Sequence, residues 1–147
     1  MLMNKEMIEQ LLYNTEKKEI LKAVDEIKDE KTLFVYAYNY NWDNGFEIPK
    51  KILNNSSCTL SIAMLLFWEA DGINYLFDKN SNDNLPEWSA FISMLYDKII
   101  NNMFINGIVA CKVPLTKVQM FKLSKTLTEK EKIFVNNIEG EDAYILI

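Results

Sequence analysis

Six polar and aromatic side chains in the middle of the chain offer the chemistry from which a site could be built. They are Trp42, Asp43, Asn44, Glu47, Glu69 and Asp71. Carboxylates can hold a hard cation such as Mg²⁺ or Ca²⁺, pair with a basic residue of a partner protein, or act as acid and base on a sugar. Their spacing matches no established acidic motif. These residues therefore predict a binding site, with no catalytic or metal-ligating role assigned to any of them.

The last two of these acids stand at an unfavourable place in the expected structure. The run of residues 60–70 is apolar almost all round, which predicts a central buried helix. Acids at a helix C-terminus cost ~0.3–1 kcal/mol unless they are compensated. Two interpretations remain: Asp71 stabilises the turn to Gly72 while Glu69 faces water or a Lys, or both acids meet Asp43 and Glu47 in one acidic cluster.

Two residue types are absent from the sequence, and their absence excludes whole classes of site. There is no His and no Arg, so all 16 basic residues are Lys. Without His the chain has no Ser-His-Asp or Cys-His pair. Cys58 and Cys111 form no CxxC motif, and both are predicted to be buried, unreactive thiols. No cofactor is predicted, and these absences favour a protein that is not an enzyme.

The charge balance points towards one kind of partner. The formal net charge is −5. An acidic chain repels nucleic acid and anionic lipid and favours a basic protein. No apolar run reaches the ~18 residues of a membrane span, and the charged N-terminus is unlike a signal peptide. We therefore expect a cytoplasmic protein with a basic protein partner, and neither nucleic acid nor membrane.

Hydrophobic spacing predicts helices along most of the chain. Apolar residues recur at helical intervals within 3–12 and 20–27, with a break at Asn14 or Thr15. By contrast, residues 33–40 alternate like a strand, although a short helix buried on all sides explains the same run. A helix from Pro86 to Met103 is the clearest amphipathic segment.

Local sequence signals predict where several of these helices begin and end. Residues 54–57 offer N-caps for the central helix, and Gly72 is expected to stop it in a left-handed conformation. Three Ser/Thr/Asn-x-x-Glu/Gln pairs have the spacing of capping boxes. They are Asn84 with Glu87, Thr116 with Gln119, and Thr128 with Glu131.

The C-terminal part leaves one structural alternative open. Residues 108–113 are apolar enough for a short strand, and the tail 143–147 either pairs with them or docks on the core. The predicted fold is therefore mainly α. It is a compact multi-helix single domain over residues 1–147, with room for one short β pair near the C-terminus.

The central tract also resembles a known family. Residues 40–49 read Tyr-Asn-Trp-Asp-Asn-Gly-Phe-Glu-Ile-Pro, and a Cys-x-Leu-x-x-Ala pattern from Cys58 leads to Ala-Asp-Gly at 70–72. This pattern resembles DUF4274, a family of small bacterial domains of unknown function, over about residues 33–104. The resemblance implies that residues 33–40 are helical and lead into the Asn-Trp-Asp loop. It implies no activity.

Two functions follow as hypotheses. The first is a non-catalytic protein-binding module, such as a toxin-immunity or accessory protein, which matches the acidity and the loop residues Trp42 and Asp43. The alternative is a carboxylate-based metal-binding or hydrolytic domain that uses the Asp/Glu cluster. Trp68 and Trp88 are predicted to be core packing, while Trp42 either plugs the core or belongs to a binding surface.

Overall fold

Helices dominate the computed structural model, which describes residues 4–80 and 84–147. The α-helices are α1 (Lys5–Tyr13), α2 (Lys17–Glu26), α3 (Glu30–Tyr38), α4 (Glu47–Leu53), α5 (Leu60–Glu69), α6 (Gly72–Phe77), α7 (Pro86–Ile100) and α8 (Lys117–Ser124). Two 3₁₀ helices, η1 (Trp42–Asn44) and η2 (Lys130–Val135), complete the regular structure. The mainly α fold is confirmed. In the described residues, β structure is confined to isolated bridges.

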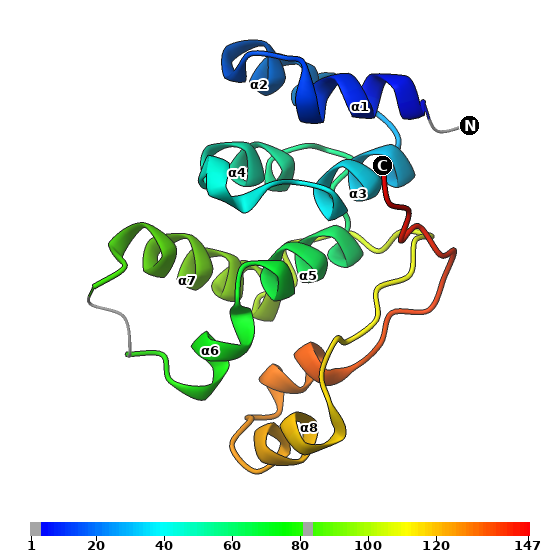
Figure 1. Cartoon of the computed structure of the whole chain (residues 1–147). Coiled ribbons are helices and arrows are strands. Elements are labelled where there is room, and N and C mark those ends of the chain that lie inside the picture. The colour runs from blue at the N-terminus through cyan, green and yellow to red at the C-terminus, as the bar shows by residue number, and fades with distance from the viewer. Residues whose placement is uncertain (1–3, 81–83) are drawn as a thin grey trace.

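The helices form a stack (Figure 1). At one end α1 and α2 cover α3 and α4; beneath these lie α5 and α7, and α8 lies at the opposite end of the molecule. Buried side chains from α1 to the C-terminal segment share one hydrophobic cluster. Within the described residues, no helix combines the length and the apolar character needed to cross a bilayer.

The strand-like alternation of residues 33–40 belongs to a helix, as the family resemblance implied. All residues from Thr32 to Ala37 are buried, because α1, α4, α5 and the C-terminal tail surround α3. A helix buried on every side loses the polar face that normally reveals its period. The carboxylate of Asp29 caps the helix by accepting hydrogen bonds from the Thr32 amide and hydroxyl, at 3.0 and 2.7 Å.

The prediction that Gly72 ends the central helix in a left-handed conformation is wrong, although this helix, α5, does end where expected. The left-handed residue is Asp71, with φ 60° and ψ 36°, and Gly72 is the first residue of α6. A glycine is required there for space. A Cβ atom on Gly72 would lie 2.3 Å from the ring and 2.5 Å from the carbonyl oxygen of Phe67.

The predicted capping boxes have different outcomes. The reciprocal Thr116–Gln119 bonds start α8, and Thr128 and Glu131 exchange equivalent bonds just before η2. The box at Asn84 is wrong, since α7 begins at Pro86 with Leu85 at its N-cap and no side-chain cap. Pro86, the first residue of α7, has no backbone N–H, so the helix start has one donor fewer for a side-chain cap to satisfy.

Asn55 does not cap the central helix as expected; it holds the end of α2 instead. Its side-chain amide is buried and donates to the carbonyl oxygens of Val24 and Ile27, at 2.7 and 2.9 Å. Its own oxygen accepts from the Ser57 amide at 2.7 Å. One side chain therefore binds two carbonyls at the end of one helix and orders the loop that leads to the next.

We expect Asn55→Ala to lower the free energy of unfolding by about 2 kcal/mol, because it leaves buried backbone groups without partners. Urea titration followed by circular dichroism measures this loss. Asn54→Ala is the matched control, since the neighbouring Asn54 side chain is exposed, and we expect it to change stability by less than about 0.5 kcal/mol. Equal effects of the two substitutions would contradict the role assigned to Asn55.

The tail 143–147 does not pair with residues 108–113, which was the first of the two predicted alternatives. Residues 108–111 exchange backbone hydrogen bonds with 138–141, at 2.7–3.0 Å. The tail docks on α3 instead, where the side chain of Asn39 donates to the Ile145 carbonyl and accepts from the Ile147 amide, at 2.8 and 3.0 Å. The second of the two predicted alternatives, docking on the core, is therefore correct.

Glu30 fastens the C-terminal part to the helical stack. One carboxylate oxygen accepts from the amides of Ile108 and Val109, at 2.8 and 3.3 Å, and the other accepts from the Thr59 hydroxyl at 2.6 Å. Gly107 leaves room for this contact, because a Cβ there would lie 2.1 Å from the carboxylate. These hydrogen bonds of Glu30 hold residues 107–109 against α3 and the start of α5.

Candidate functional site

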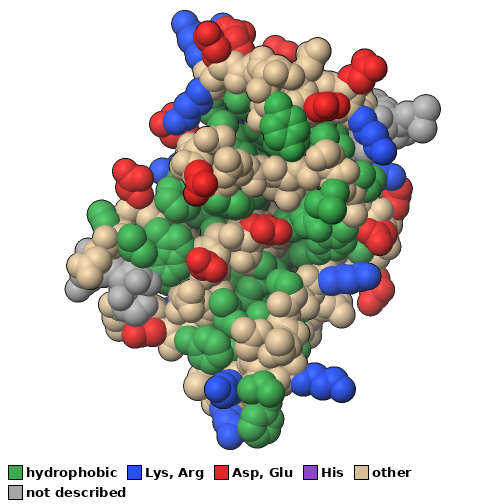
Figure 2. All heavy atoms as spheres, viewed as in Figure 1, with side chains coloured by type: hydrophobic (Ala, Val, Ile, Leu, Met, Phe, Trp, Pro, Cys, Tyr) green, Lys and Arg blue, Asp and Glu red, His purple; other side chains and the backbone are tan. Residues whose placement is uncertain are grey.

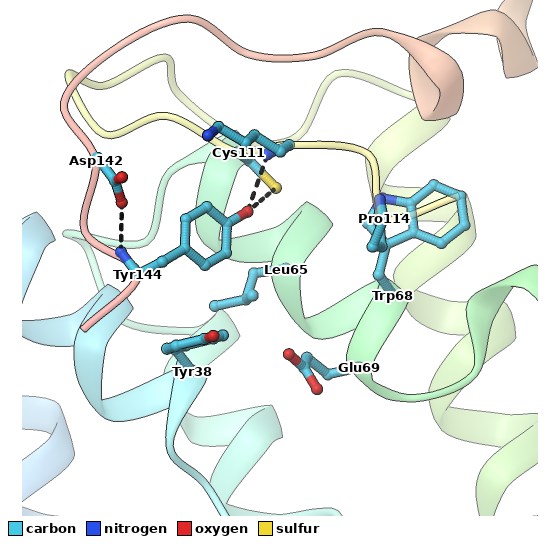
Figure 3. A pocket seen from close by; sticks show the side chains of 9 residues that line it. Tyr38, Leu65, Trp68, Glu69, Cys111, Pro114, Asp142 and Tyr144 are labelled. Carbon is cyan, nitrogen blue, oxygen red and sulfur yellow. Dashed lines mark hydrogen bonds between the residues drawn. The ribbon is translucent and has the colours of Figure 1, made fainter. Parts of the chain in front are cut away.

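A groove between the helical stack and the C-terminal segments is the best candidate for a site. It has a volume of about 440 Å³ and lies between α3, α5 and the extended chain near residues 111–114 and 142–144 (Figure 3). The side chains that line it are Tyr38, Leu65, Trp68, Glu69, Cys111, Lys112, Pro114, Asp142 and Tyr144. Mainly apolar walls with a few polar groups are typical of ligand sites.

Glu69, the last residue of α5, is the acid of the groove that comes from the helical stack. Figure 3 shows its carboxylate turned towards the side on which Tyr38 lies. Within the described residues it makes no ion pair or hydrogen bond. The residue is exposed, but the groove walls remove part of the water around its carboxylate and raise the pKa of Glu69 above its ordinary value.

Tyr144 organises the opposite wall. Its hydroxyl accepts a hydrogen bond from the Lys112 amide at 2.9 Å and donates to the sulfur of Cys111 at 3.6 Å. Its own amide donates to the carboxylate of Asp142 at 2.9 Å. The Tyr144 ring packs edge-on against Tyr38, with ring centroids 5.1 Å apart. The C-terminal segment therefore presents its aromatic ring and its acid in a fixed arrangement.

Both cysteines are buried, as predicted. Cys58 and Cys111 are free and buried. Burial raises the pKa of Cys111 to about 11, although the hydrogen bond from Tyr144 opposes this, and burial raises the pKa of Cys58 to about 12. Both thiols stay protonated near neutral pH, so neither is a nucleophile.

Trp68 contributes a polar atom without a partner. Its ring packs edge-on against Phe67 and Phe134, with centroids 5.2 and 6.4 Å apart. The indole nitrogen is buried and is the one buried side-chain nitrogen or oxygen of the described residues that makes no hydrogen bond. Buried donors are normally satisfied, so this N–H is an exception among the described residues, and its burial closes it off from the groove.

Trp42 is packing rather than surface. It lies in η1 half-buried, with its ring 5.4 Å from Tyr40 and 5.9 Å from Phe91. Its neighbours Asp43 and Asn44 are exposed, and their backbone amides bond to the side chain and carbonyl of Asn41. The loop is thus a capped turn whose aromatic residue covers the core.

The four predicted acids do not gather into one cation site. Glu47 pairs with Lys17 at 2.9 Å in a separate hollow, and Asp71 occupies the left-handed turn. In the part of the chain that the structure describes, no three Asp, Glu, His or Cys side chains lie together in a group that could hold a metal ion. Of the six residues singled out from the sequence, Glu69 is the one that lines the groove.

Charge is segregated along the molecule. Residues 112–132 contain six Lys and two Glu, a net charge of +4, so the rest of the chain carries −9. Figure 2 shows lysines and apolar side chains together at the end occupied by α8, while acidic side chains spread over the rest of the visible face. On α8, Val118 and Phe121 are exposed. The net negative charge therefore belongs to the chain outside residues 112–132.

The sequence did not identify the other residues of the groove as site residues. Tyr38 and Trp68 read as core residues, and both do pack against the core. The apolar tail predicted that residues 143–147 would dock, but nothing in the sequence told which helix they would reach. Asp142 enters the groove through this docking, which depends on the distant Asn39.

Together these features describe a mainly helical domain with an aromatic-walled, acidic groove at the edge of its helical stack. Residues 28–100, which span α3 to α7, match the family described as "Domain of unknown function (DUF4274)". The chain belongs to this family, which confirms the resemblance. No curated protein and no solved structure matches the chain. The groove thus combines residues of the family segment with residues that follow it.

Proposed function

We propose that this chain is a non-catalytic protein-binding module of the toxin-immunity or accessory type, acting in the bacterial cytoplasm on a basic partner protein. The observation that carries the proposal is the groove, where aromatic walls stand beside Glu69, an exposed carboxylate without a partner among the described residues. Such a site suits an approaching positive group.

The distribution of charge supports the same kind of partner. The net charge of −9 outside residues 112–132 favours encounter with a basic protein. The buried free thiols of Cys58 and Cys111 suit a reducing compartment such as the cytoplasm.

Position-specific photo-crosslinking in the host tests the proposal. A photo-reactive residue placed at Lys112, which lines the groove, is expected to capture one basic protein; the same residue at Glu9, on α1, is expected to capture none of it. Mass spectrometry identifies the captured protein. Capture of the same proteins at both positions, or an acidic protein at Lys112, would count against the proposal.

Charge reversal supplies a matched control. Glu69→Lys and Glu9→Lys change the net charge by the same amount, but the first places its ammonium in the groove. We expect Glu69→Lys to abolish the crosslink from Lys112 and Glu9→Lys to preserve it. Loss in both variants would mean that overall charge, and not the groove, attracts the partner.

A further inference from the structure

The aromatic walls of the groove have the chemistry that attracts cations. Tyr38 comes from α3, Trp68 from α5 and Tyr144 from the C-terminal segment. Aromatic faces attract ammonium and guanidinium groups through their negative π-clouds, and the attraction grows when the cation is partly removed from water. Three such side chains from three separate segments line one cavity.

The charges of the groove also favour a cation. Glu69 and Asp142 are negative and Lys112 is positive, so the lining carries a net charge of −1. The Asp142 carboxylate accepts a bond from the Tyr144 amide, a neutral donor. Glu69 is exposed and has no partner within the described residues, so its carboxylate is open to a cation that enters the groove.

The size of the groove sets what else can enter. A volume of about 440 Å³ exceeds that of one side chain and leaves space for the adjoining backbone of a peptide. The groove therefore matches a basic residue presented within a chain better than a free metal ion.

We propose that the groove binds one alkylammonium or guanidinium side chain, with its charge at Glu69 and its aliphatic stem against Leu65 and the aromatic walls. This inference rests on the proposed function, because it names the chemical group by which the partner would be recognised. A lysine and an arginine share this chemistry, and the test separates them.

Nuclear magnetic resonance titration of the ¹⁵N-labelled protein tests the inference with defined small probes. The probes are the Nα-acetyl N-methylamides of lysine, arginine and norleucine, where norleucine supplies a similar stem without a charge. We expect lysine, arginine or both to shift the indole N–H signal of Trp68 with millimolar affinity, and norleucine to shift it far less. Equal shifts by all three probes, or none by any, would overturn the inference.

Two conservative variants locate the charge. Glu69→Gln keeps the shape of the side chain, and we expect it to weaken binding of the charged probe about tenfold, in line with the loss of one charged hydrogen bond. Glu9→Gln on α1 makes the same change of net charge and should leave binding unchanged. Retained affinity in Glu69→Gln would place the cation elsewhere.

The two experiments fail separately. If crosslinking from Lys112 captures a basic protein but the charged probes do not bind, the proposed function stands and the single-cation inference is wrong. If the probes bind but no protein is captured, the groove is a cation site and the proposed protein partner is wrong.

Discussion

Glu131→Gln is expected to lower the free energy of unfolding at neutral pH by about 3 kcal/mol. The Glu131 side chain is 4% exposed and its carboxylate accepts from the Thr128 amide at 3.0 Å and from the Tyr96 hydroxyl at 2.6 Å. Lys79 adds an ion pair at 2.9 Å. The buried charge joins η2 to α7 and to the chain after α6, so its removal weakens several contacts at once.

The same residue gives the protein a defined acid sensitivity. Burial alone would raise the pKa of Glu131, but these hydrogen bonds outweigh it and lower the pKa from 4.5 to about 2. A folded-state pKa below the unfolded value stabilises the protein above pH 4.5, and this stability is lost as the pH falls from about 4.5 to about 2. At 1.36 kcal/mol per unit the contribution is about 3 kcal/mol.

Urea unfolding at pH 7, 5, 4 and 3 measures both effects. We expect Glu131→Gln to be less stable at pH 7 and to lose less further stability on acidification than the unsubstituted protein. Glu129→Gln is the control, because Glu129 is 88% exposed and pairs only with Lys132 among the described residues; its effect should stay below about 1 kcal/mol. Similar behaviour of the two variants would refute the role of Glu131.

Gly72→Ala is the second substitution with a large expected effect. The added Cβ would lie 2.3 Å from the Phe67 ring, which is fully buried and packed against Phe134 with centroids 4.5 Å apart. The ring has no free space to move into, and the Phe67 carbonyl blocks the backbone side at 2.5 Å. Overpacking of this kind costs about 3 kcal/mol, which would lower the melting temperature by roughly 10 °C at this chain length.

Asp71→Gly distinguishes the steric effect at Gly72 from the effect of the left-handed backbone conformation at Asp71. Asp71 carries the left-handed conformation, which costs an L-residue about 1 kcal/mol and a glycine almost nothing. We therefore expect Asp71→Gly to leave the melting temperature unchanged or to raise it, and Gly72→Ala to lower it. Differential scanning calorimetry of both variants checks this. The opposite pattern would restore Gly72 as the left-handed residue that the sequence predicted.

The sequence predicts the helices best where one face is polar or a cap is local. The Thr116–Gln119 box starts α8 because its partners are three residues apart. For α3, burial on all sides removes the helical period, and the family resemblance was needed to reject a strand. The starts of α5 and α7 were harder to predict: Asn55 holds the end of α2 instead of capping α5, and α7 begins at Pro86 without a side-chain cap.

The candidate site was predicted only in part, for a related reason. Glu69 was singled out because an acid at a helix C-terminus is unfavourable, and this local signal led to the groove. The remaining wall depends on long-range contacts, in which Asn39 binds the tail and Glu30 binds residues 108 and 109. No local pattern specifies which distant segment completes a cavity. Of the two interpretations left open for the acids, the cluster with Asp43 does not form a group that could hold a metal ion among the described residues.

The segregation of charge has a consequence for how the molecule meets others. With +4 in residues 112–132 and −9 elsewhere, and with α8 at one end of the stack, the protein carries a permanent electric dipole. In the field of a charged molecule it would turn before contact, with α8 pointing away from a basic protein and the groove side facing it. Orientation of this kind reduces the fraction of unproductive collisions, and it weakens as salt shortens the range of the field.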